Sequence, residues 1–174
     1  TWCKHIEKRP NTRGGFYQPG AYSVTVNVAF GLMQWASFEG RKAFEPLSDC
    51  MGAVHTRFAS HDISGPTAIC RSVTKLDHAR ATNGTLLNWK FSPSSLTGTT
   101  GRDSFIALMD EYIQRKGMHS QFSVVNQETL IEAQKHPDEY RDLLIRVAGY
   151  SAYFVELSKE LQDDIIGRTV LSFD

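Results

Sequence analysis

The chain has 174 residues, of which 41% are apolar, enough for one folded domain with a sizeable core. Nineteen basic side chains balance nineteen acidic ones, so no excess of positive charge indicates nucleic acid or an anionic membrane as the main partner. No apolar run approaches the roughly 18 residues of a membrane span, and the first residues do not resemble a secretory signal. We therefore expect a cytoplasmic protein.

The cysteines and histidines show no metal-binding pattern. Cys3, Cys50 and Cys70 are an odd number without C-x-x-C spacing, which argues against a disulfide framework and a zinc knuckle. We expect these cysteines to have packing roles. The six histidines lack paired ligand spacing, so we expect no metal site. The first residue is Thr1 rather than Met, which indicates a cut point inside a longer protein.

The first half of the chain is expected to hold a surface arm, one strand, a long loop and a helix. Residues 1–14 carry scattered charges with Pro and Gly, which is typical of an arm or loop. Residues 22–30 (YSVTVNVAF) alternate polar and apolar side chains and are rich in β-branched residues, so they predict a strand. Residues 31–64 show no sustained period and predict an ordered loop. A helix is expected from Pro66 to about Ala79.

The second half alternates between strands and helices. Residues 85–91 predict an extended segment, and residues 121–125 and 143–147 predict short strands. The clearest helix spans residues 100–116, followed by helices over 126–135, at Pro137 and after the cap residue Ser158. The last helix is expected to carry a solvated charged face formed by Glu156, Lys159, Glu160, Asp163, Asp164 and Arg168. The predicted class is mixed α/β.

Residues 146–151 (RVAGYS) lie between two apolar segments near the end of the sequence, where they predict the tip of a hairpin. Taken alone, Gly149 indicates only a turn residue that needs a positive φ. The longer pattern is more specific. Arg-Val-x-Gly-Tyr, followed by an aromatic residue at Phe154 and a final amphipathic helix, resembles the radical-site signature of the glycyl radical enzymes.

Further segments resemble the C-terminal part of the same family in the same order. They are residues 40–43 (GRKA), 45–49 (EPLSD), 65–68 (GPTA), 72–77 (SVTKLD), 83–88 (NGTLLN), 121–122 (QF) and 124–125 (VV). The similarity extends from about residue 14 to residue 169. Residues 148 and 151–154 (SAYF) are more similar to the diol dehydratases, choline lyases and arylacetate decarboxylases than to pyruvate formate-lyase, which tends to show Ala-Val-Arg-Phe after the glycine.

The resemblance implies the C-terminal part of a ten-stranded β/α barrel that carries a glycyl radical hairpin loop. Residues 1–50 are then the end of the barrel with a connecting loop, and residues 51–174 are the glycyl radical domain. It implies Gly149 as the radical site, with the loop supported by Arg146, Val147, Ala148, Tyr150 and Ser151. For Arg146 two roles stay open, because its side chain could bond loop carbonyls or pair with a surface carboxylate.

Two residues of the predicted strand over 22–30 are candidates for contact with substrate. Thr25 and Asn27 alternate along it and would face the inside of the barrel, where ordinary barrel filling is the alternative role. The same strand would leave an unpaired barrel edge in a free protein, which favours a larger enzyme as the natural context.

The chemistry of a backbone radical requires glycine. The unpaired electron at Cα is delocalised over the flanking amide groups, which needs a planar centre that a Cβ would crowd. The resemblance implies that a separate activase, using S-adenosylmethionine and an iron–sulfur cluster, removes a hydrogen atom from Gly149. The radical then passes to an upstream cysteine, which is none of Cys3, Cys50 and Cys70. We expect no cofactor bound to this chain and a homodimer for the full enzyme.

The leading hypothesis is therefore the radical-bearing portion of a lyase or dehydratase that cleaves C–O, C–N or C–C bonds in anaerobic metabolism. The enzyme would be cytoplasmic, with a bacterial microcompartment as a further location. One rival is a freestanding glycyl radical protein that restores a damaged or split pyruvate formate-lyase-like enzyme. A second rival is an α+β interaction domain in which Gly149 is an ordinary turn residue.

Overall fold

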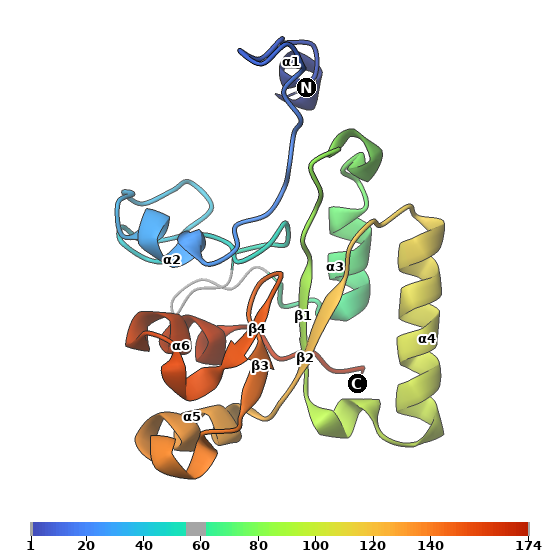
Figure 1. The fold of residues 1–174 in the computed structure, drawn as a ribbon. Coiled ribbons are helices and arrows are strands. Elements are labelled where there is room, and N and C mark those ends of the chain that lie inside the picture. Colours follow the sequence, from blue (N-terminus) through green and yellow to red (C-terminus); the bar gives the residue numbers. More distant parts are fainter. Residues whose placement is uncertain (1, 55–61, 174) are drawn as a thin grey trace.

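The computed structural model describes residues 2–54 and 62–173. These residues form helices and strands in alternation, so the mixed α/β class is confirmed. Figure 1 shows two small sheets at the centre, with α3 and α4 on one side and α5 and α6 on the other. The N-terminal helix α1 (Trp2–Ile6) stands apart from this body, at the end of an extended segment.

The first sheet is a parallel pair with a helical crossover. β1 (Asn88–Phe91) pairs with β2 (Gln121–Val124) so that Asn88 lies opposite Gln121 and Phe91 opposite Val124. The connection contains the short 3-10 helix η2 (Pro93–Leu96) and α4 (Gly98–Gln114), which packs beside α3 (Gly65–Val73). A crossover of this kind is what a parallel pair needs. The core here consists of Ile69, Cys70, Val73, Leu87, Trp89, Phe91, Leu108, Tyr112 and Leu171.

The second sheet is an antiparallel hairpin. β3 (Leu144–Arg146) pairs with β4 (Ser151–Tyr153), and α5 (Gln127–Lys135) and α6 (Lys159–Gly167) cover it. Short 3-10 helices precede β3 at η3 (Pro137–Tyr140) and follow β4 at η4 (Phe154–Glu156). A second core, formed by Leu130, Ala133, Ile145, Val147, Phe154 and Ile165, fixes the hairpin on these helices.

The predicted strand over residues 22–30 is wrong. These residues form a turn and then the helix α2 (Val26–Gly31), while a single parallel bridge joins Ala21 to Thr85. Alternation shows which side chains share a face. A strand also needs a neighbouring strand to hydrogen-bond its backbone, and alternation does not show whether one is present. The argument from an open barrel edge therefore has no basis in this structure.

Two smaller predictions also need correction. The arm over residues 1–14 contains α1, and Glu7 forms an ion pair with Arg80 of η1 (His78–Arg80). The helix predicted to reach Ala79 ends at Val73, and the chain turns before η1. The helices over 100–116 and 126–135 and the cap at Ser158, whose Oγ accepts from the Leu161 N–H, are confirmed within a few residues. No helix among the described residues has the length and apolar character needed to cross a membrane.

Candidate functional site

The loop of the β3–β4 hairpin has two central residues, Ala148 and Gly149. The Val147 N–H donates to the Tyr150 carbonyl oxygen at 2.9 Å, which closes the loop. Gly149 has φ +83°, the positive value that the second central position of a type II turn requires. The sequence thus places glycine where a side chain would be strained.

Gly149 is exposed at the tip, whereas the two residues before it are fully buried. Among the described residues, a Cβ added to Gly149 would meet the Leu86 side chain alone, at 3.4 Å from Cδ1. Val147 anchors the loop in the second core, and Ala148 beside it is fully buried, so that Gly149 is presented on a rigid base. The Gly149 N–H is held as well, because it donates to Oε1 of Gln121 at 2.8 Å.

Gln121 begins β2 and links the loop to the parallel sheet. Its Oε1 also accepts from Nε of Arg146 at 3.1 Å, and its Nε2 donates to Oδ1 of Asn88. Asn88 begins β1 at the paired position of the register, so both amides lie on the same face. Gln121 is 6% exposed, and a polar group buried to this degree needs such partners.

The chain of polar side chains continues into a buried ion cluster. Nδ2 of Asn88 donates to Oδ2 of Asp49 at 2.6 Å, and Nε of Arg168 lies 3.2 Å from the same oxygen. Arg168 also donates from Nη1 to the Val147 carbonyl oxygen at 2.7 Å and from Nη2 to Oδ2 of Asp164 at 3.2 Å. Buried charges persist when they are paired and hydrogen-bonded in this way.

The expectation of a solvated face at Asp164 and Arg168 is therefore wrong. Asp164 and Arg168 are 7% and 8% exposed, respectively, while Lys159 and Asp163 form an exposed pair. Charge alternation along α6 does not show that one of its edges faces the hairpin.

Lys90 completes this cluster beneath the end of α6. Its Nζ donates to the carbonyl oxygens of Ile165, Ile166 and Arg168 at 3.1–3.3 Å, where a helix terminus presents unpaired acceptors. Burial, with the nearby Arg168 charge, lowers the pKa of Lys90 from its ordinary value of 10.5 to about 8. The ammonium thus holds α6 at a cost in desolvation.

The remaining predicted loop residues surround Gly149 as follows. Arg146 donates from Nη1 to the Ser151 hydroxyl at 3.4 Å, so its side chain bonds Gln121 and Ser151, a third arrangement beside the two left open. The Ser123 hydroxyl donates to the Arg146 carbonyl oxygen at 3.0 Å. Tyr150 is partly exposed at the tip.

Thr25 immediately precedes α2, and Asn27 lies in its first turn. Asn27 is buried, and its Nδ2 donates to Oδ1 of Asp164 at 3.3 Å and to the Leu47 carbonyl oxygen at 3.5 Å. Since residues 22–30 do not form the predicted strand, the strand argument for these two residues no longer holds, and their contact with a substrate stays a prediction.

Cys50 and Cys70 occupy packed positions, whereas Cys3 is half-buried in α1, which has no buried residues. Cys70 is fully buried in the first core, and Cys50 packs against it. Burial, with the adjacent Asp49 charge, raises the pKa of the Cys50 thiol well above its usual range. Among residues 2–54 and 62–173, no group of three His, Cys, Asp or Glu side chains could hold a metal ion.

The sequence profile described as glycine radical matches residues 53–155, which include β1, β2 and the whole hairpin. The chain belongs to the glycine radical family.

Relatives in the glycine radical family align with almost the whole chain. It is 54% identical over 172 residues, 99% of its length, to a (2S)-3-sulfopropanediol dehydratase from Klebsiella oxytoca, and 42% identical over the same share to a trans-4-hydroxy-L-proline dehydratase from Clostridioides difficile. A solved structure, the B12-independent glycerol dehydratase from Clostridium butyricum with glycerol bound, matches 99% of the chain with a TM-score of 0.92 and 46% identity. The chain spans about a fifth of the length of these proteins, 21% in each case.

The sequence did not predict the buried polar residues that fix the β3–β4 hairpin loop. Asp49, Asn88 and Gln121 were part of segments similar to the family, but their contacts with one another were not foreseen. One signal was available, because Asn88 and Gln121 are polar residues next to apolar strand positions. Polar side chains that start inward-facing strands need hydrogen-bond partners. Asn88 and Gln121 are therefore candidates to bond each other.

Proposed function

We propose that this chain is the radical-bearing C-terminal portion of a longer glycyl radical dehydratase or lyase. The observation that carries the proposal is the geometry of Gly149. It lies inside the segment matched to the glycine radical family, at the tip of a hairpin with φ +83°, on a buried base formed by Val147 and Ala148.

Gly149 is the residue that stores the radical in this proposal. A separate activase, using S-adenosylmethionine and an iron–sulfur cluster, supplies a deoxyadenosyl radical that takes one hydrogen atom from Gly149. Deoxyadenosine and a Cα radical result. Arg146 and Ser151 support the loop through the bonds described above.

In turnover, the Gly149 radical takes the hydrogen atom of a cysteine thiol, which restores the glycine and leaves a thiyl radical. The thiyl then acts on the substrate. We assign this cysteine to a part of the longer enzyme outside the present chain. The packed settings of Cys50 and Cys70 support the assignment, since Cys70 is fully buried in the first core and the half-buried Cys50 packs against that core.

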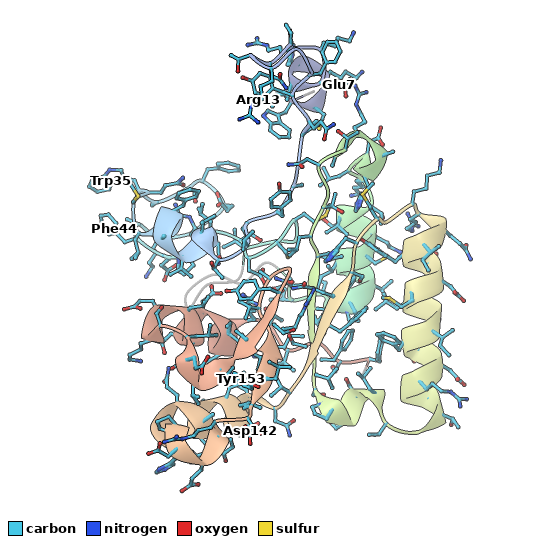
Figure 2. The ribbon with its side chains drawn as sticks, in the orientation of Figure 1. Glu7, Arg13, Trp35, Phe44, Asp142 and Tyr153 are labelled. Carbon is cyan, nitrogen blue, oxygen red and sulfur yellow. The ribbon has the colours of Figure 1, made fainter. Side chains whose placement is uncertain are left out.

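Exposed apolar side chains in the N-terminal third of the chain support the view that a further portion of the protein packs on it. Many large apolar side chains between residues 16 and 44 are exposed: Phe16, Tyr17, Tyr22, Val24, Val26, Phe30, Leu32, Met33, Trp35, Phe38 and Phe44. Figure 2 shows Trp35 and Phe44 at the outer edge of this segment, away from the two sheets. Exposed apolar surface of this extent marks an interface.

We infer that the rest of a β/α barrel covers this surface. Residues 1–50 then belong to the barrel end with its connecting loop, and residues 51–174 form the radical domain. The full enzyme is proposed to be a cytoplasmic homodimer, in some hosts inside a microcompartment. The names of the relatives, which include dehydratases and isethionate sulfite-lyases, favour an eliminating enzyme over the freestanding radical protein.

The test compares the activity of this chain alone with that of the longer enzyme that contains it. After anaerobic incubation with activase, reductant and S-adenosylmethionine, the chain alone should convert neither glycerol nor propane-1,2-diol. An enclosed site is needed for radical intermediates, and the chain leaves Gly149 exposed. Activity should require the preceding portion. Product formed by the chain alone in a Gly149-dependent manner would contradict the proposal and would make Cys50 and Cys70 the first candidates for the thiyl.

A further inference from the structure

The hydrogen bond from Gly149 to Gln121 depends on which atom Gln121 presents to the loop. A glutamine side chain offers an oxygen that accepts or an NH₂ group that donates, and the two differ by a rotation of the amide. At Gly149 only the oxygen is useful, because the backbone group is an N–H donor. Something must therefore hold the Gln121 amide in one orientation.

The neighbouring side chains fix this orientation by elimination. The Asp49 carboxylate, beside the Arg168 guanidinium, only accepts, so Asn88 must turn its Nδ2 toward Asp49. The Asn88 oxygen then faces Gln121 and accepts from its Nε2. Oε1 of Gln121 is left pointing at the Gly149 N–H and at Nε of Arg146.

The same cluster also holds the loop from its other side. Arg168 donates to the Val147 carbonyl oxygen at 2.7 Å, while Gln121 accepts from the Gly149 N–H at 2.8 Å. The series Arg168, Asp49, Asn88 and Gln121 thus begins and ends on the loop and fixes a backbone group on each side of Ala148. Apart from Asn88, which is half-buried, these side chains are less than 9% exposed, so water competes little for the bonds.

We propose that Gln121 is a positioning residue for the glycyl radical, oriented through Asn88 and Asp49 by Arg168. The proposal rests on the proposed function in that Gly149 carries the radical. Delocalisation into the 148–149 peptide requires this group to stay coplanar with the radical centre. The Gln121 oxygen fixes the direction of the N–H and, as an acceptor, strengthens electron donation by the nitrogen.

Three variants in the longer enzyme separate this role from general stability. Gln121→Met keeps the length of the side chain and removes its oxygen, whereas Gln121→Glu keeps an oxygen that accepts from Gly149. Gln162→Met is the matched control. Gln162 is 8% exposed and donates to the Phe154 and Leu157 carbonyl oxygens, outside the loop. If Gln121→Met does not fold, Gln121→Asn takes its place, because the shorter side chain withdraws the amide from Gly149 by one methylene.

Two measurements are made on each variant. Hydrogen–deuterium exchange of the peptide containing residues 147–151 reports the hold on the Gly149 N–H without any radical. Electron paramagnetic resonance after anaerobic activation reports the half-life of the radical and, with ¹⁵N-glycine, its nitrogen hyperfine coupling. We expect Gln121→Met to exchange about 5–10 times faster in this peptide and to shorten the radical half-life by a similar factor, with a changed coupling. Gln162→Met should stay close to the wild type. Gln121→Glu should fall between the wild type and Gln121→Met, because its carboxylate still accepts from Gly149 but no longer donates to Oδ1 of Asn88.

The proposal is overturned if Gln121→Met matches the wild type in exchange and in radical lifetime. It is also overturned if Gln162→Met produces the same losses, because the effect would then be one of stability alone. A wild type that forms no radical would defeat the proposed function instead. In that case the exchange comparison still decides whether Gln121 holds Gly149.

Discussion

Nη1 of Arg168 donates to the carbonyl oxygen of Val147 at 2.7 Å, so the end of α6 holds the hairpin loop two residues before Gly149. Val147 is fully buried and Arg168 nearly so, and the guanidinium also meets Asp49 and Asp164. The loop is consequently tied to the last helix as well as to its own strands. Stability and the placement of Gly149 are therefore coupled through one cation.

Replacing Arg168 with methionine should lower the free energy of unfolding by about 3–5 kcal/mol, because Asp49 and Asp164 lose the buried cation that they share. Arg102 provides the control. It forms an ion pair with Asp103 in which both side chains are about two-thirds exposed, and Arg102→Met should change the free energy by less than about 0.5 kcal/mol. Urea unfolding of the chain measures both values. Equal small changes would show that the cluster contributes little.

Gly149→Ala should fold, with a loss of about 1–2 kcal/mol in the free energy of unfolding. The positive φ strains any Cβ, but the nearest atom to that Cβ is the Leu86 side chain at 3.4 Å. Gly84 is the matched control, since it has φ +104° and no atom of the described part of the chain lies within 4 Å of an added Cβ. Gly84→Ala should lose a similar amount. A Gly149→Ala protein that cannot fold would contradict this account of the turn.

Oxygen should cut the activated enzyme at the hairpin tip. Dioxygen adds to the Cα radical, and the resulting peroxyl group fragments the main chain at Gly149. The released piece should carry residues 150–174. Mass spectrometry after air exposure measures it, with unactivated protein as the control. Intact chain from radical-loaded protein would count against the site.

Lys90 should make stability depend on pH in the alkaline range. Its pKa is about 8 in the folded chain and 10.5 ordinarily, so between these values the unfolded chain binds more protons. The stability contribution of Lys90 therefore rises with pH from about 8 to 10.5 and is lost as pH falls through 8. The free energy of unfolding of the wild type, relative to Lys90→Met, should increase over this range by at most about 1.4 kcal/mol per pH unit. Parallel profiles for the two proteins would refute the shift.

Local patterns predicted much of the C-terminal two-thirds. The periodic apolar residues of α4 and the cap at Ser158 define helices without help from distant parts of the chain. The hairpin at residues 146–151 was likewise predicted from two apolar segments around a glycine.

The errors concern distant contacts. Residues 22–30 have the composition of a strand, but no strand among the described residues completes a ladder there. Arg168 is charged and is therefore expected at the surface. It is buried by partners that lie far away along the chain, Asp49 at 119 positions and Val147 at 21. Gln121 and Gly149, 28 residues apart, meet only because the two sheets pack together. Periodicity shows which residues lie on the same face of a helix or strand. It does not show which other part of the chain packs on that face.

The central claim is that Gly149 carries the radical, and electron paramagnetic resonance tests it most directly. The longer enzyme is activated without oxygen by activase, reductant and S-adenosylmethionine, once with ordinary glycine and once with Cα-deuterated glycine. The account predicts a doublet from the Cα hydrogen of Gly149 that collapses on deuteration and is absent from Gly149→Ala, while Gly84→Ala retains it. A normal doublet from Gly149→Ala would contradict the claim.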